Sequence, residues 1–149
     1  MLNLSEARSW LPPDLQGRVQ RPYYLPLTTA AALGAGATTT LSTSFQNVSA
    51  FLIIAIVGRV YTVAAPQTSL PDPGLTVQVQ FSSGDDMTFG AVPWSAIIQS
   101  AIDPNPGQSG LIAPRLVPGG SNISITLADY DATAYLIRLA LCGLNIYST

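Results

Sequence analysis

The chain contains no histidine and no lysine among its 149 residues. Without histidine it cannot form a Ser-His-Asp or Cys-His nucleophile arrangement, or a metal site built on imidazole. Without lysine it lacks Schiff-base and phosphate-binding ammonium groups. Its acid–base groups are mainly eight carboxylates, of which Glu6 is the only glutamate. We therefore predict a protein that is not an enzyme, with no catalytic residue and no cofactor.

Charge is scarce as well. Charged residues make up 9% of the chain, against about 25% in a typical soluble domain. The net charge is −2, and the six cations are all arginines, three of them within the first 21 residues. Nucleic-acid binding needs cations clustered along a track, so we do not expect it. Depletion of charge is typical of interface cores, which favours a surface covered by partner proteins. The alternative to a covered surface is one exposed to solvent and hydrated by Ser, Thr, Asn and Gln.

Cysteine and long apolar runs are also rare. The single Cys142 excludes an internal disulfide, and its apolar neighbours predict a buried thiol. The longest apolar run, Ala50 to Val57, is much shorter than the roughly 20 residues of a membrane-spanning helix. The first ten residues lack the basic start and apolar stretch of a secretory signal. We therefore expect neither a membrane partner nor export.

The residues that are present indicate β-structure. Leu75, Val77, Val79 and Phe81 alternate with polar residues, the pattern of a half-buried strand. Similar alternation occurs over residues 41–45 and 122–127, whereas residues 51–63 read as a central strand buried on both faces. Proline-rich segments at 66–74 and 103–107 predict loops. About seven or eight strands predict an all-β fold, a jelly-roll-like antiparallel β-sandwich.

Two of these strands are separated by a short polar turn, Asp129 to Asp131, and we predict that they form a β-hairpin. Their inward-facing residues are expected to be buried: Ile123, Ile125, Leu127, Ile137, Leu139 and Leu141.

Residues 1–22 differ from the rest, and we treat them as an extended N-terminal arm before a sandwich domain at 23–149. Ser5 to Trp10 can form one helical turn, which Pro12 ends. Such an arm either orders on a partner or packs across its own domain, and the sequence leaves both open. The candidate partner-binding residues are Trp10, Leu11, Leu15, Arg18 and Arg21.

The carboxylates show no catalytic or metal-binding spacing. Asp129 with Asp131 and Asp85 with Asp86 fit turns better than a catalytic pair. Asp103, Asn105 and Gln108 share one loop, but they lack the 12-residue calcium pattern and its terminal glutamate. We therefore predict no metal site.

The order of these segments carries a family resemblance. Pro22 to Leu27 leads into the Thr/Ser-rich strand Thr38 to Phe45, and Leu75 to Val79 lies in the middle. Gly119 to Leu127 and the closing Ala134 to Gly143 follow. This layout resembles the small jelly-roll structural proteins of tailed bacteriophages that decorate or cement the capsid shell. The resemblance covers most of residues 22–147 and lies in strand and turn chemistry; Asp129-Tyr130-Asp131 departs from the expected Asn-containing turn.

The resemblance implies a non-enzymatic virion protein that binds the major capsid protein and forms a homo-oligomer, with a trimer favoured. A phage tail or connector component is an alternative within the same class. A carbohydrate-binding adhesion module is the alternative from another class. Its aromatic platforms would come from Tyr23, Tyr24, Trp94 and Tyr130.

Overall fold

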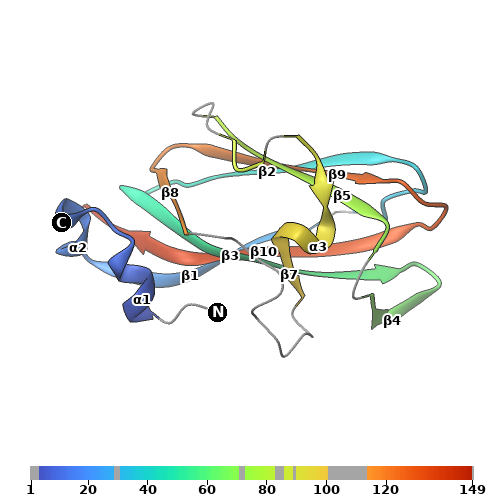
Figure 1. Ribbon diagram of the computed structural model, residues 1–149, viewed down its shortest axis with the longest axis horizontal. Coiled ribbons are helices and arrows are strands. Elements are labelled where there is room, and N and C mark those ends of the chain that lie inside the picture. Colours follow the sequence, from blue (N-terminus) through green and yellow to red (C-terminus); the bar gives the residue numbers. More distant parts are fainter. Residues whose placement is uncertain are drawn as a thin grey trace.

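The computed structural model describes residues 4–28, 31–70, 73–82, 86–88, 90–100 and 114–148. In these residues ten strands form two sheets that pack face to face (Figure 1). Sheet A contains β1 (Gln20–Thr28), β10 (Tyr135–Ile146), β3 (Ala50–Thr62) and β4 (Ala65–Ser69), and β7 (Ile98–Ser100) and β8 (Arg115–Pro118) also pair with β3. Sheet B contains β2 (Thr38–Ser44), β9 (Asn122–Asp129), β5 (Leu75–Phe81) and β6 (Val92–Pro93).

The strand order identifies the topology as a jelly roll. In sheet A the last strand, β10, lies between β1 and β3, and in sheet B the ninth lies between β2 and β5. The chain crosses repeatedly between the sheets, which is the double Greek key of a jelly roll. Among the described strands every pair is antiparallel except β3 with β7, which run parallel. The predicted all-β, jelly-roll-like sandwich is confirmed.

The predicted hairpin at the end of the chain is wrong in its pairing. β9 pairs with β2 and β5 in sheet B, whereas β10 pairs with β1 and β3 in sheet A. The turn after Asp129 therefore carries the chain from one sheet to the other. Period-two alternation shows which face of a strand is buried, but strands in two facing sheets share that pattern. The expected burial is confirmed, since all six inward residues are at most 3% exposed.

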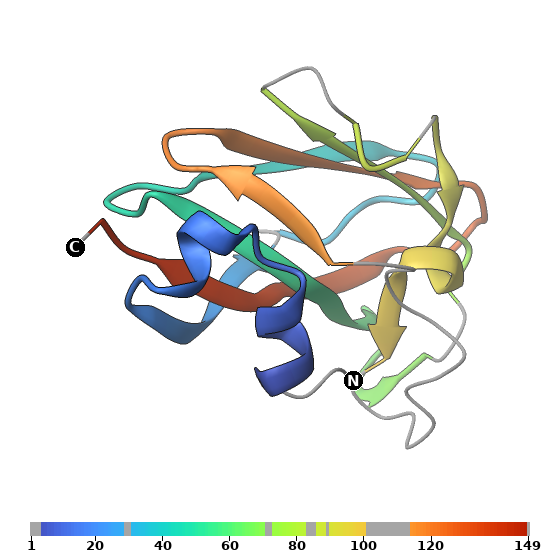
Figure 2. The same cartoon turned by 60° about the vertical axis from the view of Figure 1, so that its left-hand side comes forward.

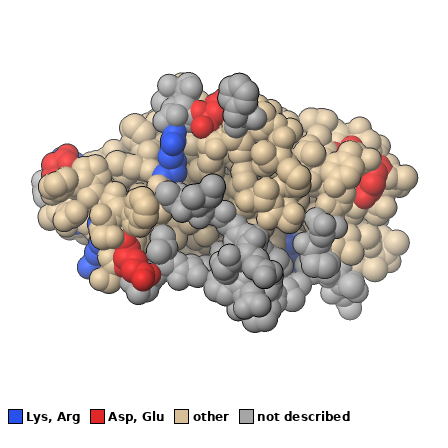
Figure 3. All heavy atoms as spheres, viewed as in Figure 1, with Lys and Arg blue, Asp and Glu red and all other residues tan. Residues whose placement is uncertain are grey.

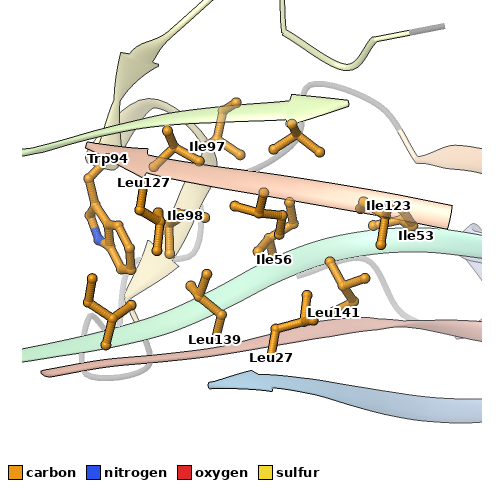
Figure 4. Packing of buried hydrophobic residues seen from close by; sticks show 14 of the residues in the cluster. Leu27, Ile53, Ile56, Trp94, Ile97, Ile98, Ile123, Leu127, Leu139 and Leu141 are labelled. Atoms are coloured by element: carbon orange, nitrogen blue, oxygen red, sulfur yellow. The ribbon is translucent and has the colours of Figure 1, made fainter. Parts of the chain in front are cut away.

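The main core fills the space between the sheets (Figure 4). β9 contributes Ile123, Ile125 and Leu127 from one side, and β10 contributes Leu139 and Leu141 from the other. The short helix α3 (Trp94–Ile97) lies between β6 and β7, where the chain passes from sheet B to sheet A (Figure 1). It adds Trp94 and Ile97 to the core.

Part of the proline-rich segment 66–74 is a strand rather than a loop. β4 includes Pro66 and pairs with the end of β3. A proline lacks the N–H that a central strand needs, but an edge strand can hold it. β4 lies at the end of the sheet order, so the proline is accommodated there.

The N-terminal arm is packed on its own domain, the second of the two arrangements that the sequence left open. It forms the helices α1 (Leu4–Ser9) and α2 (Pro13–Gln16) rather than an extended segment (Figure 2). A second apolar cluster joins the arm to the outer face of sheet A, and its buried members are Ala7, Leu11, Ala50, Leu52, Leu144 and Ile146. β1 already begins at Gln20, so residues 20–22 of the range assigned to the arm belong to the sheet.

Replacing Leu139 by alanine is expected to cost about 2–5 kcal/mol of unfolding free energy, the usual range for truncating a core leucine. Leu139 is 3% exposed and faces the core from the centre of β10. Leu136, on the same strand, is only partly buried, and its replacement by alanine is the control. Urea denaturation of both variants measures the difference. Equal losses at the two positions would show that β10 does not present its faces as described.

Candidate functional site

The exposed apolar side chains concentrate near the N-terminus. Figure 3 shows a face whose described surface is mostly uncharged, with a few scattered acidic and basic groups. Among the described residues six large apolar side chains are exposed: Trp10, Val19, Tyr23, Tyr24, Val63 and Tyr130. Four of these six lie within residues 10–24, which span the arm and the first half of β1. Exposed apolar groups favour a protein contact in this part of the chain, and Tyr23 and Tyr24, as neighbours in β1, offer their rings on opposite faces of sheet A.

The three apolar residues predicted to bind a partner take different positions. Trp10 is 51% exposed at the end of α1 and is accessible to a partner. Leu11 is 3% exposed, and Leu15 packs against the same second cluster as Leu11. Leu11 and Leu15 therefore attach the arm to sheet A, which leaves Trp10 as the apolar candidate for contact.

The two predicted arginines fix the chain between the arm and β1. Arg18 donates from Nη1 to Ser49 Oγ at 3.2 Å. The Arg21 guanidinium lies 5.9 Å from the ring centre of Tyr147, within reach of a cation–π interaction. The Tyr147 N–H also donates to the Val19 carbonyl at 3.0 Å. Arg18 therefore ties the arm to the residue before β3, whereas Arg21 and Val19 hold the start of β1 against Tyr147, just after β10.

A pocket of about 310 Å³ opens at this end of the sandwich. Its lining comes from three separate stretches of the chain: Tyr23, Leu25, Ser44, Phe45, Gln46, Asn47, Val48, Asn145 and Tyr147. Asn145 is 8% exposed, and its Nδ2 donates to the Tyr147 hydroxyl at 3.3 Å. Phe45 stacks on Phe51 at 4.8 Å between ring centres. No pattern in the sequence predicts this pocket, although Tyr23 is one of the aromatic residues expected to form a platform.

The chemistry of the pocket fits a neutral ligand. Amide and hydroxyl groups line it beside tyrosine rings, and none of the described lining residues is charged. Amides can donate and accept hydrogen bonds, while tyrosine rings offer apolar faces. The other proposed platforms lie elsewhere: Tyr24 and Tyr130 are both 65% exposed, but Trp94 is 2% exposed and belongs to the core. The expectation that Trp94 forms a surface platform is therefore wrong.

The Asp129–Asp131 segment uses its carboxylates for turn structure. Asp129 Oδ1 accepts from the Asp131 N–H at 2.8 Å, and Asp131 Oδ1 accepts from the Thr133 N–H at 2.7 Å. The Tyr135 hydroxyl donates to Asp131 Oδ2, which lowers the pKa of the Asp131 carboxyl. These are the side-chain-to-backbone bonds expected of aspartates in turns.

No group of three metal-ligating side chains occurs in the described part of the chain. The segment with Asp103, Asn105 and Gln108 lies outside the described residues, as does Asp85. None of the helices described here is long and apolar enough to cross a membrane.

Cys142 is buried, as the sequence predicted, and burial raises the pKa of its thiol to about 11 from an ordinary value of 9.0. We expect the folded protein to react slowly with thiol reagents and to react fast once unfolded, because the thiolate is the reactive form. The folded state holds the proton more tightly than the unfolded state. The stabilisation is therefore complete below about pH 9 and is lost as pH rises towards about 11.

The loss is at most about 2–3 kcal/mol, because one unit of pKa corresponds to about 1.4 kcal/mol. Urea denaturation at a series of pH values measures it, with Cys142→Ala as the control that lacks the thiol. Tyr135, whose pKa burial also raises, contributes equally to both proteins. A wild-type protein that loses no more stability than Cys142→Ala over this range would contradict the prediction.

Comparisons with protein-family models, with curated proteins and with solved structures find no match to this chain.

Proposed function

We propose that the chain is a non-enzymatic virion structural protein that decorates or cements a capsid shell by binding the major capsid protein. The observation that carries the proposal is the position of the large apolar side chains exposed among the described residues, of which four in six belong to the arm or β1. Apolar groups that remain exposed on a folded domain favour a protein partner at that end.

Two further properties support this proposal. The jelly roll is an architecture that viral capsid domains use, although the same fold also serves lectins and cupins. The chain has neither histidine nor lysine, and its described aspartates at 129 and 131 serve a turn. A tail or connector position in the particle would use the same apolar end.

Co-sedimentation with empty shells of the major capsid protein tests the proposal. We expect the wild-type chain to bind and Trp10→Ala to bind at least tenfold more weakly, since truncating a central aromatic anchor costs about 2 kcal/mol or more. Tyr130→Ala is the matched control, because Tyr130 is also an exposed aromatic but follows β9, far along the chain from the arm. Deleting the arm is a poor test, because Leu11 and Ala7 cover Leu52 and Leu144.

A wild-type chain that does not co-sediment would contradict the capsid role. Equal binding by Trp10→Ala and the wild type would keep the role and exclude Trp10 as the anchor. The copy number of the chain relative to the major capsid protein in purified particles separates a shell position from a tail or connector position.

The pocket favours one second candidate function, the binding of a neutral saccharide. Its tyrosine rings and amides match a ligand with apolar faces and hydroxyl groups. On a glycan array, Tyr23→Ala should abolish binding, whereas Tyr24→Ala should not, because Tyr24 does not line the pocket. Absence of binding by the wild-type chain would exclude this candidate.

A further inference from the structure

The free edges of the two sheets differ in how they are protected against pairing with another strand. Proteins commonly block edges with prolines, charges, bulges or very short strands. β1 carries Pro22 and Pro26, β4 carries Pro66, and β6 consists of Val92 and Pro93 alone. β2 has none of these devices: its seven residues, Thr-Thr-Thr-Leu-Ser-Thr-Ser, include no proline and no charge. Its register with β9 runs without a bulge.

The hydrogen bonds at both ends of β2 show which of its backbone groups are free. The Ala37 carbonyl accepts from Asp129, and the Phe45 N–H donates to Ser121. In an antiparallel pair the groups that point at a neighbour alternate along the strand. The odd-numbered residues of β2 therefore bond to β9. The N–H and C=O groups of the even-numbered residues point to the open edge: Thr38, Thr40, Ser42 and Ser44.

β2 is chemically symmetric about Leu41. If a second β2 runs antiparallel with Leu41 opposite Leu41, then Thr40 faces Ser42 of the second copy and Thr38 faces its Ser44. Every outer-face pair then brings two hydroxyl side chains together. Hydroxyl pairs of this kind already join β2 to β9, where Thr40 Oγ1 lies 3.1 Å from Thr126 Oγ1.

The inner face of β2 favours the same alignment. Leu41 is only partly buried and packs against the main core. In the self-paired arrangement the two Leu41 side chains form a pair without mutual hydrogen bonds, in which side chains approach most closely. Each leucine would therefore cover the exposed part of the other.

Charge does not oppose this pairing. The sequence holds no charged residue between Arg21 and Arg59, a stretch that includes all of β2.

We propose that β2 pairs antiparallel with β2 of a second copy, across a two-fold axis at Leu41, so that the two B sheets form one continuous sheet. This inference is independent of the capsid role. It also predicts a dimer in place of the trimer that the family resemblance implies.

Three variants test the register by light scattering or sedimentation equilibrium. The wild type should have twice the single-chain mass of 15.6 kDa. Thr40→Lys with Ser42→Lys places lysine opposite lysine twice, and should raise the dissociation constant at least about 100-fold, since opposed like charges cost several kcal/mol. Thr40→Glu with Ser42→Lys places glutamate opposite lysine twice, and should keep the dimer. Thr126→Lys adds a charge to the same outer face one strand away from the edge, and should also leave the dimer intact.

All substituted positions lie on the outer face of sheet B, away from the core, and circular dichroism verifies that each variant is folded. A wild type that is monomeric at its highest soluble concentration, or trimeric, would overturn the proposal. So would a double-lysine variant that remains dimeric, or a glutamate–lysine variant that dissociates. Dissociation of Thr126→Lys would show that copies stack face to face, which also overturns edge pairing.

Discussion

Replacing Gly143 by alanine is expected to lower the unfolding free energy by at least about 3 kcal/mol, at or beyond the upper end of the usual cost of overpacking. A Cβ atom at this position would lie 2.0 Å from the Leu52 carbonyl oxygen and 2.9 Å from Phe51 Cε1. The obstacle is backbone, so no change of rotamer can relieve the contact. Relief requires β10 and β3 to move apart.

The surroundings of Gly143 make that movement costly. The register between β10 and β3 shifts between Cys142 and Gly143, where Cys142 faces Ala55 and Gly143 faces Ile53. Ile54 is the extra residue of a β-bulge, which already bends β3 locally. Displacing the two strands there would disturb the residues of sheet A that contact the arm, Leu52 and Leu144 among them.

Gly17→Ala is the matched control, because it makes the same chemical change in open space. Apart from Gly17 and its two chain neighbours, no described atom lies within 4 Å of a Cβ at this position, and its φ of −82° suits alanine. We expect this variant to be more stable by about 0.4–1 kcal/mol, because alanine restricts the unfolded chain. Urea denaturation compares both variants with the wild type. A Gly143→Ala protein as stable as the wild type would mean that β3 and β10 are spaced more widely than described.

The buried face of each strand could be predicted from the sequence, but the pairing of the strands could not. The inward positions of β9 and β10 follow from period-two alternation, which depends only on the two faces of a strand. The assignment of the two strands to different sheets depends on contacts with distant β2 and β1. A polar turn such as Asp129–Asp131 allows a hairpin and a crossing between sheets equally well.

Single residues of the candidate site could be selected from the sequence, but their meeting in one pocket could not. Tyr23, Asn145 and Tyr147 meet because β1 pairs with β10, and residues 44–48 reach them at the end of β2. No local sequence pattern predicts that these side chains come together. Likewise, Leu11 was recognisable as an apolar anchor, but its contact with Leu52 and Leu144 is set by the fold of sheet A.

The position of Trp94 also could not be predicted from the sequence, which suggested a surface platform. Its replacement gives the second large expected loss of unfolding free energy. Replacing Trp94 by alanine should cost about 3–5 kcal/mol, the range for removing a large buried aromatic. Its side chain is 2% exposed within the main core. A Cβ added at Gly58 would lie 2.8 Å from Trp94 Cζ2, so the ring packs closely over the glycine of β3. Alanine at position 94 would leave this space empty.

Trp10→Ala is the natural control, because the chain has two tryptophans and the other is 51% exposed. Its effect on the unfolding free energy should stay near the 0.5 kcal/mol or so typical of surface changes. The two variants should therefore separate stability from binding: Trp94→Ala loses stability, whereas Trp10→Ala stays folded and, under the proposed capsid role, loses attachment to the shell. Any loss of glycan binding in Trp94→Ala would follow from unfolding, since the ring does not line the pocket. Urea denaturation measures the unfolding free energy of both variants. A Trp94→Ala protein that is no less stable than Trp10→Ala would contradict the burial of Trp94 in the core.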